Sequence, residues 1–303
     1  MNATDSPRII FMHIPKTGGT TLRAALRRSY ADGTFFLPDV PDENDGRYLR
    51  YIREEVESFQ FNEDLHKRHL GGFESLDPDA QANVQLFMGH FWYGAHARVP
   101  GPCRYFTMLR EPIERSLSLY AHRVAHQGLT VPIDRYFQTA RDWELDNGQT
   151  RRLAGLEIAN PHQPVTERTL EVAKEHLAMF GAVGVTERFN ETVLAITTSI
   201  ARPTLEYGWD NPSSDRAQRD ALDPAVLRVH IERNEYDTEL HRYAGELLDH
   251  SLSGLDVERE LRRLAATNRR ADRRSQLHQR LYRARVAGSR VKRAVWKRPA
   301  PKP

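Results

Sequence analysis

The sequence predicts an α/β protein in which helices cover both faces of a mostly parallel sheet. Short, continuous apolar runs such as Arg8–His13 and Tyr105–Leu109 are typical of strands that are buried on both faces. Each of these runs leads through a polar turn into a helical pattern, and strands that alternate with helices indicate a three-layer α/β domain. The composition, 39% hydrophobic and 28% charged over 303 residues, fits a globular chain of that size.

The first unit of this pattern is the apolar run Arg8–His13, followed by a glycine-containing turn and a helix that begins near Leu22. Further strands are predicted at Gln85–Met88 and Gly181–Val185, and the Tyr105–Leu109 strand continues into a helix through His126. The remaining predicted helices are Trp143–Leu153, Thr166–Phe180, Phe189–Ile200 and Pro224–His250. Residues 42–72 are polar with helical stretches, and a loop rich in Pro, Ser and Asp is predicted at 211–223.

The net charge of +3 conceals two oppositely charged parts. Residues 251–303 contain 16 Lys and Arg against 4 Asp and Glu, whereas residues 1–250 contain 28 against 37. We therefore predict one domain over residues 1–250 and a basic, helical to disordered extension over 251–303.

Cys103 is the single cysteine, which excludes an intramolecular disulfide and a cysteine-based zinc site. The N-terminal residues lack the apolar core of a signal peptide, so none is expected, and no run approaches the about 20 apolar residues of a membrane span. A cytoplasmic location is expected.

The turn after the first strand has the composition of an anion-binding site. Lys16, Thr17, Gly18, Gly19, Thr20 and Thr21 are consecutive. The glycines permit close approach of the backbone, the helix start supplies unpaired N–H groups, and the side chains add a positive charge and hydroxyl donors. An ordinary strand-to-helix turn with a solvent-facing lysine is the alternative. The lysine precedes both glycines, so the GxxxxGK[ST] motif of ATPases is absent.

A second anion site is predicted after the Tyr105–Leu109 strand. Arg110 stands at the strand end and can bind a phosphate through two N–H groups. Ser118 follows two turns into the next helix and can donate a hydrogen bond. Arg115 is a third candidate, and its spacing also allows the alternative of a pair with Glu111 or Glu114 on the helix surface.

The segment His13–Leu22 resembles the 5′-phosphosulfate loop of carbohydrate sulfotransferases, in particular the 2-O- and 6-O-sulfotransferase branch and its bacterial relatives. The segment from Arg110 to Tyr120 is similar to the 3′-phosphate motif of that family. The resemblance covers roughly residues 8–248. It implies a three-layer, P-loop-like sulfotransferase fold, 3′-phosphoadenosine 5′-phosphosulfate (PAPS) as donor, and binding of the 3′-phosphate by Arg110 and Ser118.

Sulfuryl transfer needs charge stabilisation at the leaving oxygen and a base for the acceptor hydroxyl. Lys16 fits the first role, and no carboxylate pair near either loop suggests a metal site. The resemblance makes His90, which follows the Gln85–Met88 strand, the base. The alternatives are a structural His90, a role for His96 in the same loop, and a His13 that orients the phosphate loop.

The segment Asp146–Gly155 resembles one in bacterial relatives that opens a helix over the acceptor. On that resemblance Asn147, Gln149 and Arg151 contact a polar acceptor, expected to be a glycan or glycolipid. An N-capped helix with an exposed polar face is the equal alternative.

Two other functions stay open from the sequence. One is a nucleotide-dependent kinase or phosphotransferase. The other is an adaptor that acts through the basic extension, whose charge and Trp296 favour peripheral contact with an anionic inner-membrane surface over nucleic acid.

Overall fold

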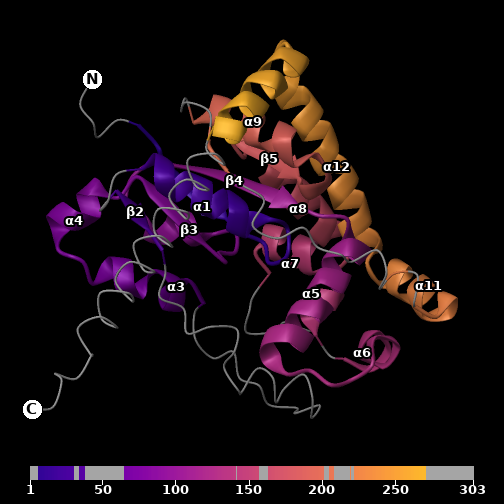
Figure 1. Cartoon of the computed structure of the whole chain (residues 1–303). Coiled ribbons are helices and arrows are strands. Elements are labelled where there is room, and N and C mark those ends of the chain that lie inside the picture. The colour runs from indigo at the N-terminus through magenta and orange to yellow at the C-terminus, as the bar shows by residue number, and fades with distance from the viewer. Residues whose placement is uncertain are drawn as a thin grey trace, which may run out of the picture.

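A five-stranded sheet forms the centre of the molecule in a computed structural model (Figure 1). The structure describes residues 6–30, 34–37, 65–140, 142–156, 163–200, 205–207, 219 and 222–270. The strand order is β2-β3-β1-β4-β5, and every neighbouring pair is parallel. The strands are β1 (Arg8–Met12), β2 (Phe35–Phe36), β3 (Leu86–Gly89), β4 (Cys103–Leu109) and β5 (Ala182–Val185).

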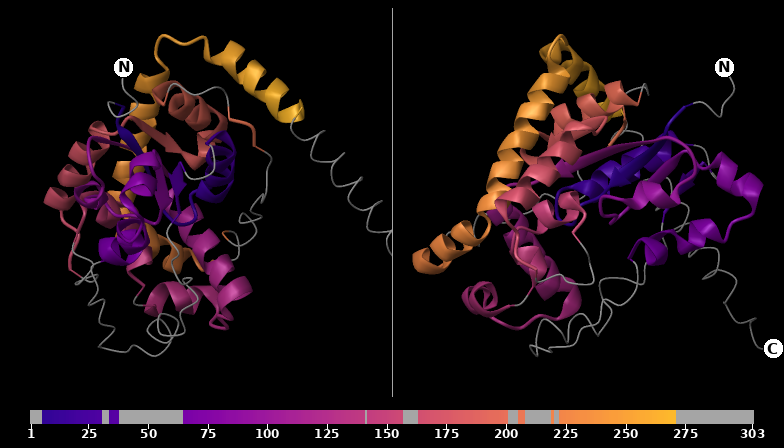
Figure 2. Two further views of the ribbon diagram at one scale, coloured as in Figure 1. Left: turned by 90° about the vertical axis from the view of Figure 1, so that its left-hand side faces the viewer. Right: turned by 180° about the vertical axis from the view of Figure 1, so that it is seen from behind.

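Helices pack on both faces of this sheet (Figure 2). They are α1 (Gly19–Ser29), α3 (Leu65–Glu74), α4 (Pro78–Asn83), α5 (Pro112–Gln127), α6 (Ile133–Thr139), α7 (Gly148–Ala154), α8 (Glu167–Ala178), α9 (Phe189–Ser199), α11 (Pro224–Arg233) and α12 (Glu235–Leu252). Residues 257–270 are also helical. Short 3-10 turns occupy Ala95–Arg98, Trp143–Leu145 and Thr186–Arg188. The predicted α/β class with a parallel central sheet is confirmed.

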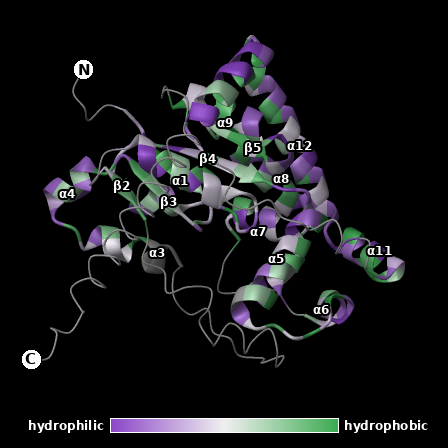
Figure 3. Ribbon diagram, viewed as in Figure 1, coloured by the Kyte–Doolittle hydropathy of each residue, from purple (hydrophilic) through white to green (hydrophobic). Residues whose placement is uncertain are grey.

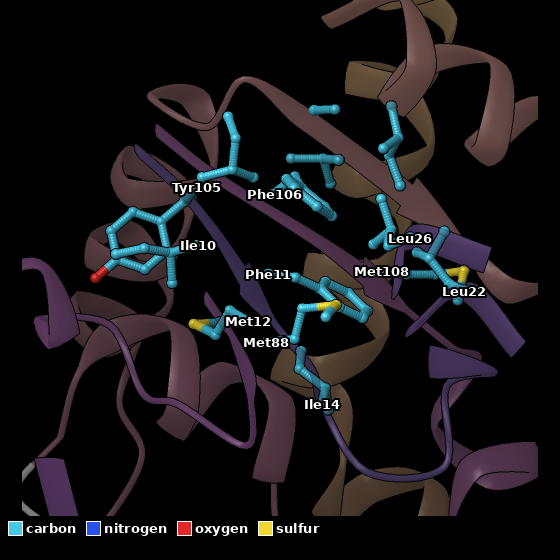
Figure 4. Close-up of a cluster of buried hydrophobic side chains, with 14 of the residues drawn as sticks. Ile10, Phe11, Met12, Ile14, Leu22, Leu26, Met88, Tyr105, Phe106 and Met108 are labelled. Atoms are coloured by element: carbon cyan, nitrogen blue, oxygen red, sulfur yellow. The ribbon is translucent and has the colours of Figure 1, made fainter. Parts of the chain in front are cut away.

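The central strand β1 shows why the sheet is covered on both sides. Ile10, Phe11 and Met12 point alternately to opposite faces, yet each is 0% exposed. The ring of Phe11 stacks on that of Phe106 in β4, with centroids 5.2 Å apart. Figure 4 shows part of this core, and Figure 3 shows that the strands are predominantly hydrophobic. A continuous apolar run is therefore the correct signature for this strand.

The strand order places a ligand-binding edge next to β1 and β4. The chain leaves β1 toward the β2 side of the sheet and leaves β4 toward β5. Open parallel sheets bind ligands at the carboxyl ends of neighbouring strands whose connections diverge in this way. The turns after β1 and β4 carry the two predicted anion sites.

Two predicted helices are divided in the structure. The helix expected over Pro224–His250 is two helices, α11 and α12, which meet at Asn234 (φ −112°, ψ 28°). The Asn234 side chain donates to the carbonyls of His230 and Leu145, and such local bonds compete with helix continuation. The helix expected over Trp143–Leu153 starts as a 3-10 turn and becomes α-helical only after Asn147, whose φ is +50°.

The start of the basic extension packs on the sheet domain. Leu252 and Leu264 are buried in the main core cluster, and Leu255 and Leu261 pack against it. The Asn268 side chain accepts a hydrogen bond from the backbone N–H of Tyr207 at 3.1 Å. A second core cluster joins α5, α6 and α11. Residues 271–303, most of 42–72 and most of 211–223 lie outside the described part of the chain.

Candidate functional site

The turn after β1 has the backbone of an anion-binding loop. Gly18 (φ +79°) caps α1, which begins at Gly19, so the first N–H groups of the helix open onto the turn. Lys16 also has a positive φ of 69°, a conformation that costs a non-glycine residue on the order of 1 kcal/mol and is concentrated at functional sites. The buried hydroxyl of Thr17 donates to the Ile14 carbonyl at 2.8 Å. Thr20 is exposed and Thr21 half-buried at the start of the helix.

Gly19 is glycine because the ring of His13 lies against it. A Cβ atom at position 19 would come within 2.0 Å of Cδ2 of His13. His13 is 5% exposed, and its Nδ1 is buried without a hydrogen-bond partner. Burial first, and then the charges of His90 and Arg23, hold the pKa of His13 well below its ordinary value. His13 is therefore a neutral, fixed ring at the base of the loop.

His90, just beyond β3, stacks on this ring. The two ring centroids are 4.5 Å apart with an interplanar angle of 29°, and Nδ1 of His90 lies 2.9 Å from the carbonyl oxygen of His13. A carbonyl oxygen can only accept, so Nδ1 carries a proton, and the neutral form of the ring then has its lone pair on Nε2. His96 is held elsewhere, with Nδ1 3.0 Å from the hydroxyl of Tyr105.

The two predicted anion sites meet at the ends of β1 and β4. Nη1 of Arg110 donates to the carbonyl oxygen of Lys16 at 3.2 Å. The hydroxyl of Thr186, which follows β5, lies 2.8 Å from the carbonyl oxygen of Thr17 and 3.0 Å from that of Leu109. The loop and the strand end therefore form one continuous structure, with Arg110 beside Lys16.

Helix α5 carries the other predicted residues of the second site. Ser118 is 9% exposed, and Nη2 of Arg110 is 4.0 Å from the Glu114 carboxylate. Arg115 is fully buried and pairs neither with Glu111 nor with Glu114. Its partner is Glu144, at 2.8 Å.

Asn147, Gln149 and Arg151 are all buried, at 4%, 0% and 2% exposure, and all bond to the protein. Gln149 bonds to the backbone of Arg110, and Arg151 donates to the carbonyls of Asp146 and Gln163. Nδ2 of Asn147 donates to the Arg233 carbonyl at 2.8 Å. The exposed polar face of the alternative interpretation is not observed, and the acceptor role of these side chains stays a prediction.

A buried ion network that the sequence did not predict supports the His90 side of the site. Glu144 pairs with both Arg115 and Arg152. Burial would raise the pKa of Glu144, but the two arginines outweigh it and lower that pKa. The Arg152 guanidinium lies 4.8 Å from the ring centroid of Trp143 and donates to the His90 carbonyl at 3.4 Å. In the sequence, Glu144, Arg115 and Arg152 follow no periodic pattern. Their pairing therefore cannot be predicted before the fold is known.

Two further properties concern metals and membranes. Among the residues that the structure describes, no three His, Cys, Asp or Glu side chains lie together as metal ligands would. In the same part of the chain, no helix is both long enough and apolar enough to cross a bilayer.

Comparison with known proteins identifies the family. A crystal structure of a sulfotransferase from Alicyclobacillus acidocaldarius is similar over 77% of this chain and 96% of its own, with 15% identity and a TM-score of 0.39. No curated protein matches the sequence. The model of the sulfotransferase family matches residues 1–244, which is most of the chain. This protein therefore belongs to the sulfotransferase family, whose members are enzymes that transfer sulfuryl groups.

Proposed function

We propose that this enzyme transfers a sulfuryl group from PAPS to a hydroxyl of a carbohydrate or another polar acceptor. The observation that carries the proposal is the contact between Arg110 and Lys16. The Arg110 guanidinium, at the end of β4, bonds to the backbone of Lys16 in the loop after β1, so the two predicted anion sites adjoin, as a nucleotide phosphorylated at both ends requires. A donor with one phosphorylated end needs only one of them.

The residues divide between the two ends of the donor. In the proposal the 5′-phosphosulfate lies on the loop, whose members are Lys16, Thr17, Gly18, Gly19, Thr20 and Thr21. Arg110 and Ser118 bind the 3′-phosphate. The ammonium group of Lys16 stabilises the negative charge that develops on the leaving phosphate oxygen.

His90 is the proposed base. Its tautomer is the one a base requires, because Nδ1–H is held by the His13 carbonyl and Nε2 can accept the proton of the acceptor hydroxyl. The stacked ring of His13 fixes the plane of the imidazole. His90 is half-buried, so the proton donor can approach from solvent.

The proposal is tested by transfer of labelled sulfate from PAPS to a panel of glycans and glycolipids. We expect Lys16→Ala and His90→Ala each to lower kcat by about 10²- to 10⁴-fold. The free energy of unfolding of both variants should equal that of the wild type. The control is His250→Gln, which changes an exposed histidine of α12 and should keep full activity. Full activity in both Lys16→Ala and His90→Ala would refute the assigned roles, and Mg²⁺-dependent transfer of phosphate from ATP would favour the kinase alternative.

We also propose that the basic extension contacts an anionic membrane surface and so brings the enzyme to a glycolipid acceptor. The support is its charge of 16 basic against 4 acidic residues. Co-sedimentation with vesicles that contain about 30% anionic lipid should decrease steeply with salt, because the attraction is screened. Binding to neutral vesicles of equal strength would contradict this role.

A further inference from the structure

The backbone of Arg110 is held by a side chain from a distant helix. Arg110 is the first residue after β4, whose pairing with β5 ends at Leu109 and Val185. Its N–H donates to Oε1 of Gln149 at 3.0 Å, and its carbonyl accepts from Nε2 of Gln149 at 2.9 Å. The primary amide of Gln149 thus makes the two hydrogen bonds to Arg110 that the backbone of a neighbouring strand would make.

The geometry leaves one orientation for this amide. The N–H of Arg110 can only donate and its carbonyl can only accept, so Oε1 and Nε2 of Gln149 are assigned by their partners. Gln149 is 0% exposed. Both heavy atoms of its amide group therefore bond to Arg110.

Gln149 is itself held in place by a residue of α12. The Asp237 carboxylate accepts from the backbone N–H groups of Gln149 and Thr150 at 3.1 and 2.7 Å. It also accepts from the hydroxyl of Thr150 at 2.8 Å. Asp237 and Thr150 are 0% exposed. A rigid, buried path therefore runs from the start of α12 through α7 to the Arg110 backbone.

The path ends at the proposed nucleotide site, because the side chain of Arg110 donates to the Lys16 carbonyl. A guanidinium group selects a phosphate by the direction of its N–H groups, and that direction depends on the backbone from which the side chain starts. We infer that Gln149 is the positioning residue that aims Arg110 at the 3′-phosphate and so sets the preference for nucleotides that carry one. The inference rests on the proposed function and gives Gln149 a role on the donor side of the site.

The test compares two nucleotides that differ only in the 3′-phosphate, adenosine 3′,5′-bisphosphate and AMP. In calorimetry, Gln149→Met removes both hydrogen bonds at nearly constant volume and without a change of charge. We expect the preference for the bisphosphate to fall about tenfold, with AMP affinity almost unchanged. A general loss of native structure would instead lower the affinities for the bisphosphate and for AMP together.

The matched control is Thr197→Val in α9, which removes the hydrogen bonds that a buried hydroxyl donates to the carbonyls of Val193 and Leu194, away from this path. It should lower the free energy of unfolding and leave the nucleotide preference intact. A Gln149→Met protein that keeps the full preference would overturn the inference. A wild-type protein that binds both nucleotides equally would instead overturn the proposed function.

A double-mutant cycle shows whether Gln149 acts through Arg110. Arg110→Met should lower the preference, and Gln149→Met added to it should lower the preference no further. Additive losses would contradict the inference. Should Gln149→Met fail to fold, Gln149→Glu keeps the acceptor for the Arg110 N–H but opposes its carbonyl with an oxygen, and it should also lower the preference. An unchanged preference in Gln149→Glu would then overturn the inference.

Discussion

At the scale of single residues, two buried histidines make the stability of the enzyme depend on pH. Burial, followed by the charges of Arg233 and Arg115, lowers the pKa of His230 from 6.5 to about 3. Its ring stacks on Phe137 with centroids 4.3 Å apart, and its Nε2 is buried without a hydrogen-bond partner. The neutral form is therefore the one that fits the fold.

The sign of the pH dependence follows from this lowered pKa. Above pH 6.5 the histidine is neutral in both states, but below it the unfolded chain binds a proton that folded His230 does not. We expect His230 to lower the free energy of unfolding by about 2 kcal/mol at pH 5 relative to pH 7, with a further loss from His13. In urea titrations, the free energy of unfolding of His230→Leu should differ less between pH 5 and pH 7 than that of the wild type, by about 2 kcal/mol. His250→Gln, on the exposed face of α12, should not, and an unchanged difference in His230→Leu would contradict the account.

The sequence could suggest residues of the candidate site but not the side chains that hold them in place. Lys16 and Arg110 were expected because each follows a recognisable buried strand, and the role of His90 was expected from the family resemblance. Gln149 was expected from the resemblance to contact the acceptor, and its bonds to the Arg110 backbone, 39 residues away in the sequence, were not predicted. Long-range hydrogen bonds of this kind leave no periodic pattern in the sequence.

At the scale of elements, the junction of β1 and α1 is sterically constrained. The Cβ of an alanine at position 19 would lie 2.0 Å from Cδ2 of His13, so the ring that supports His90 would have to move. We expect Gly19→Ala to cost about 1–3 kcal/mol of stability and to lower kcat more than the affinity for the bisphosphate. The measurement is urea unfolding together with steady-state kinetics.

Gly245 in α12 offers the matched control for this substitution. A Cβ there meets nothing within 4 Å, and alanine is favoured over glycine inside a helix. Gly245→Ala should raise the free energy of unfolding by about 0.5–1 kcal/mol with full activity. Equal changes in the free energy of unfolding and in kcat for Gly19→Ala and Gly245→Ala would show that His13 does not restrict position 19.

The strands were more predictable than the helix ends. β1, β3, β4 and β5 correspond to apolar runs in the sequence, whereas the two residues of β2 are too short for a pattern. The break between α11 and α12 depends on Asn234, whose side chain reaches Leu145 across the fold. An asparagine inside a periodic helical pattern does not reveal such a partner.

At the scale of the whole molecule, residues beyond 250 contribute to the main core. Leu264 is 1% exposed within the same cluster as the strands. We expect Leu264→Ala to cost about 2–4 kcal/mol in a single cooperative unfolding transition. Leu76→Ala, at an exposed position, should change stability by less than about 0.5 kcal/mol. Unchanged stability in Leu264→Ala would instead support a domain that ends near residue 250.

In the proposed function, one nucleotide spans the ends of β1 and β4 with a phosphate group at each. Calorimetry with adenosine 3′,5′-bisphosphate and with ADP tests it directly, since the two ligands carry the same number of phosphates in different places. We expect the bisphosphate to bind at least about tenfold more tightly than ADP. ADP affinity equal to or greater than that of the bisphosphate would contradict it.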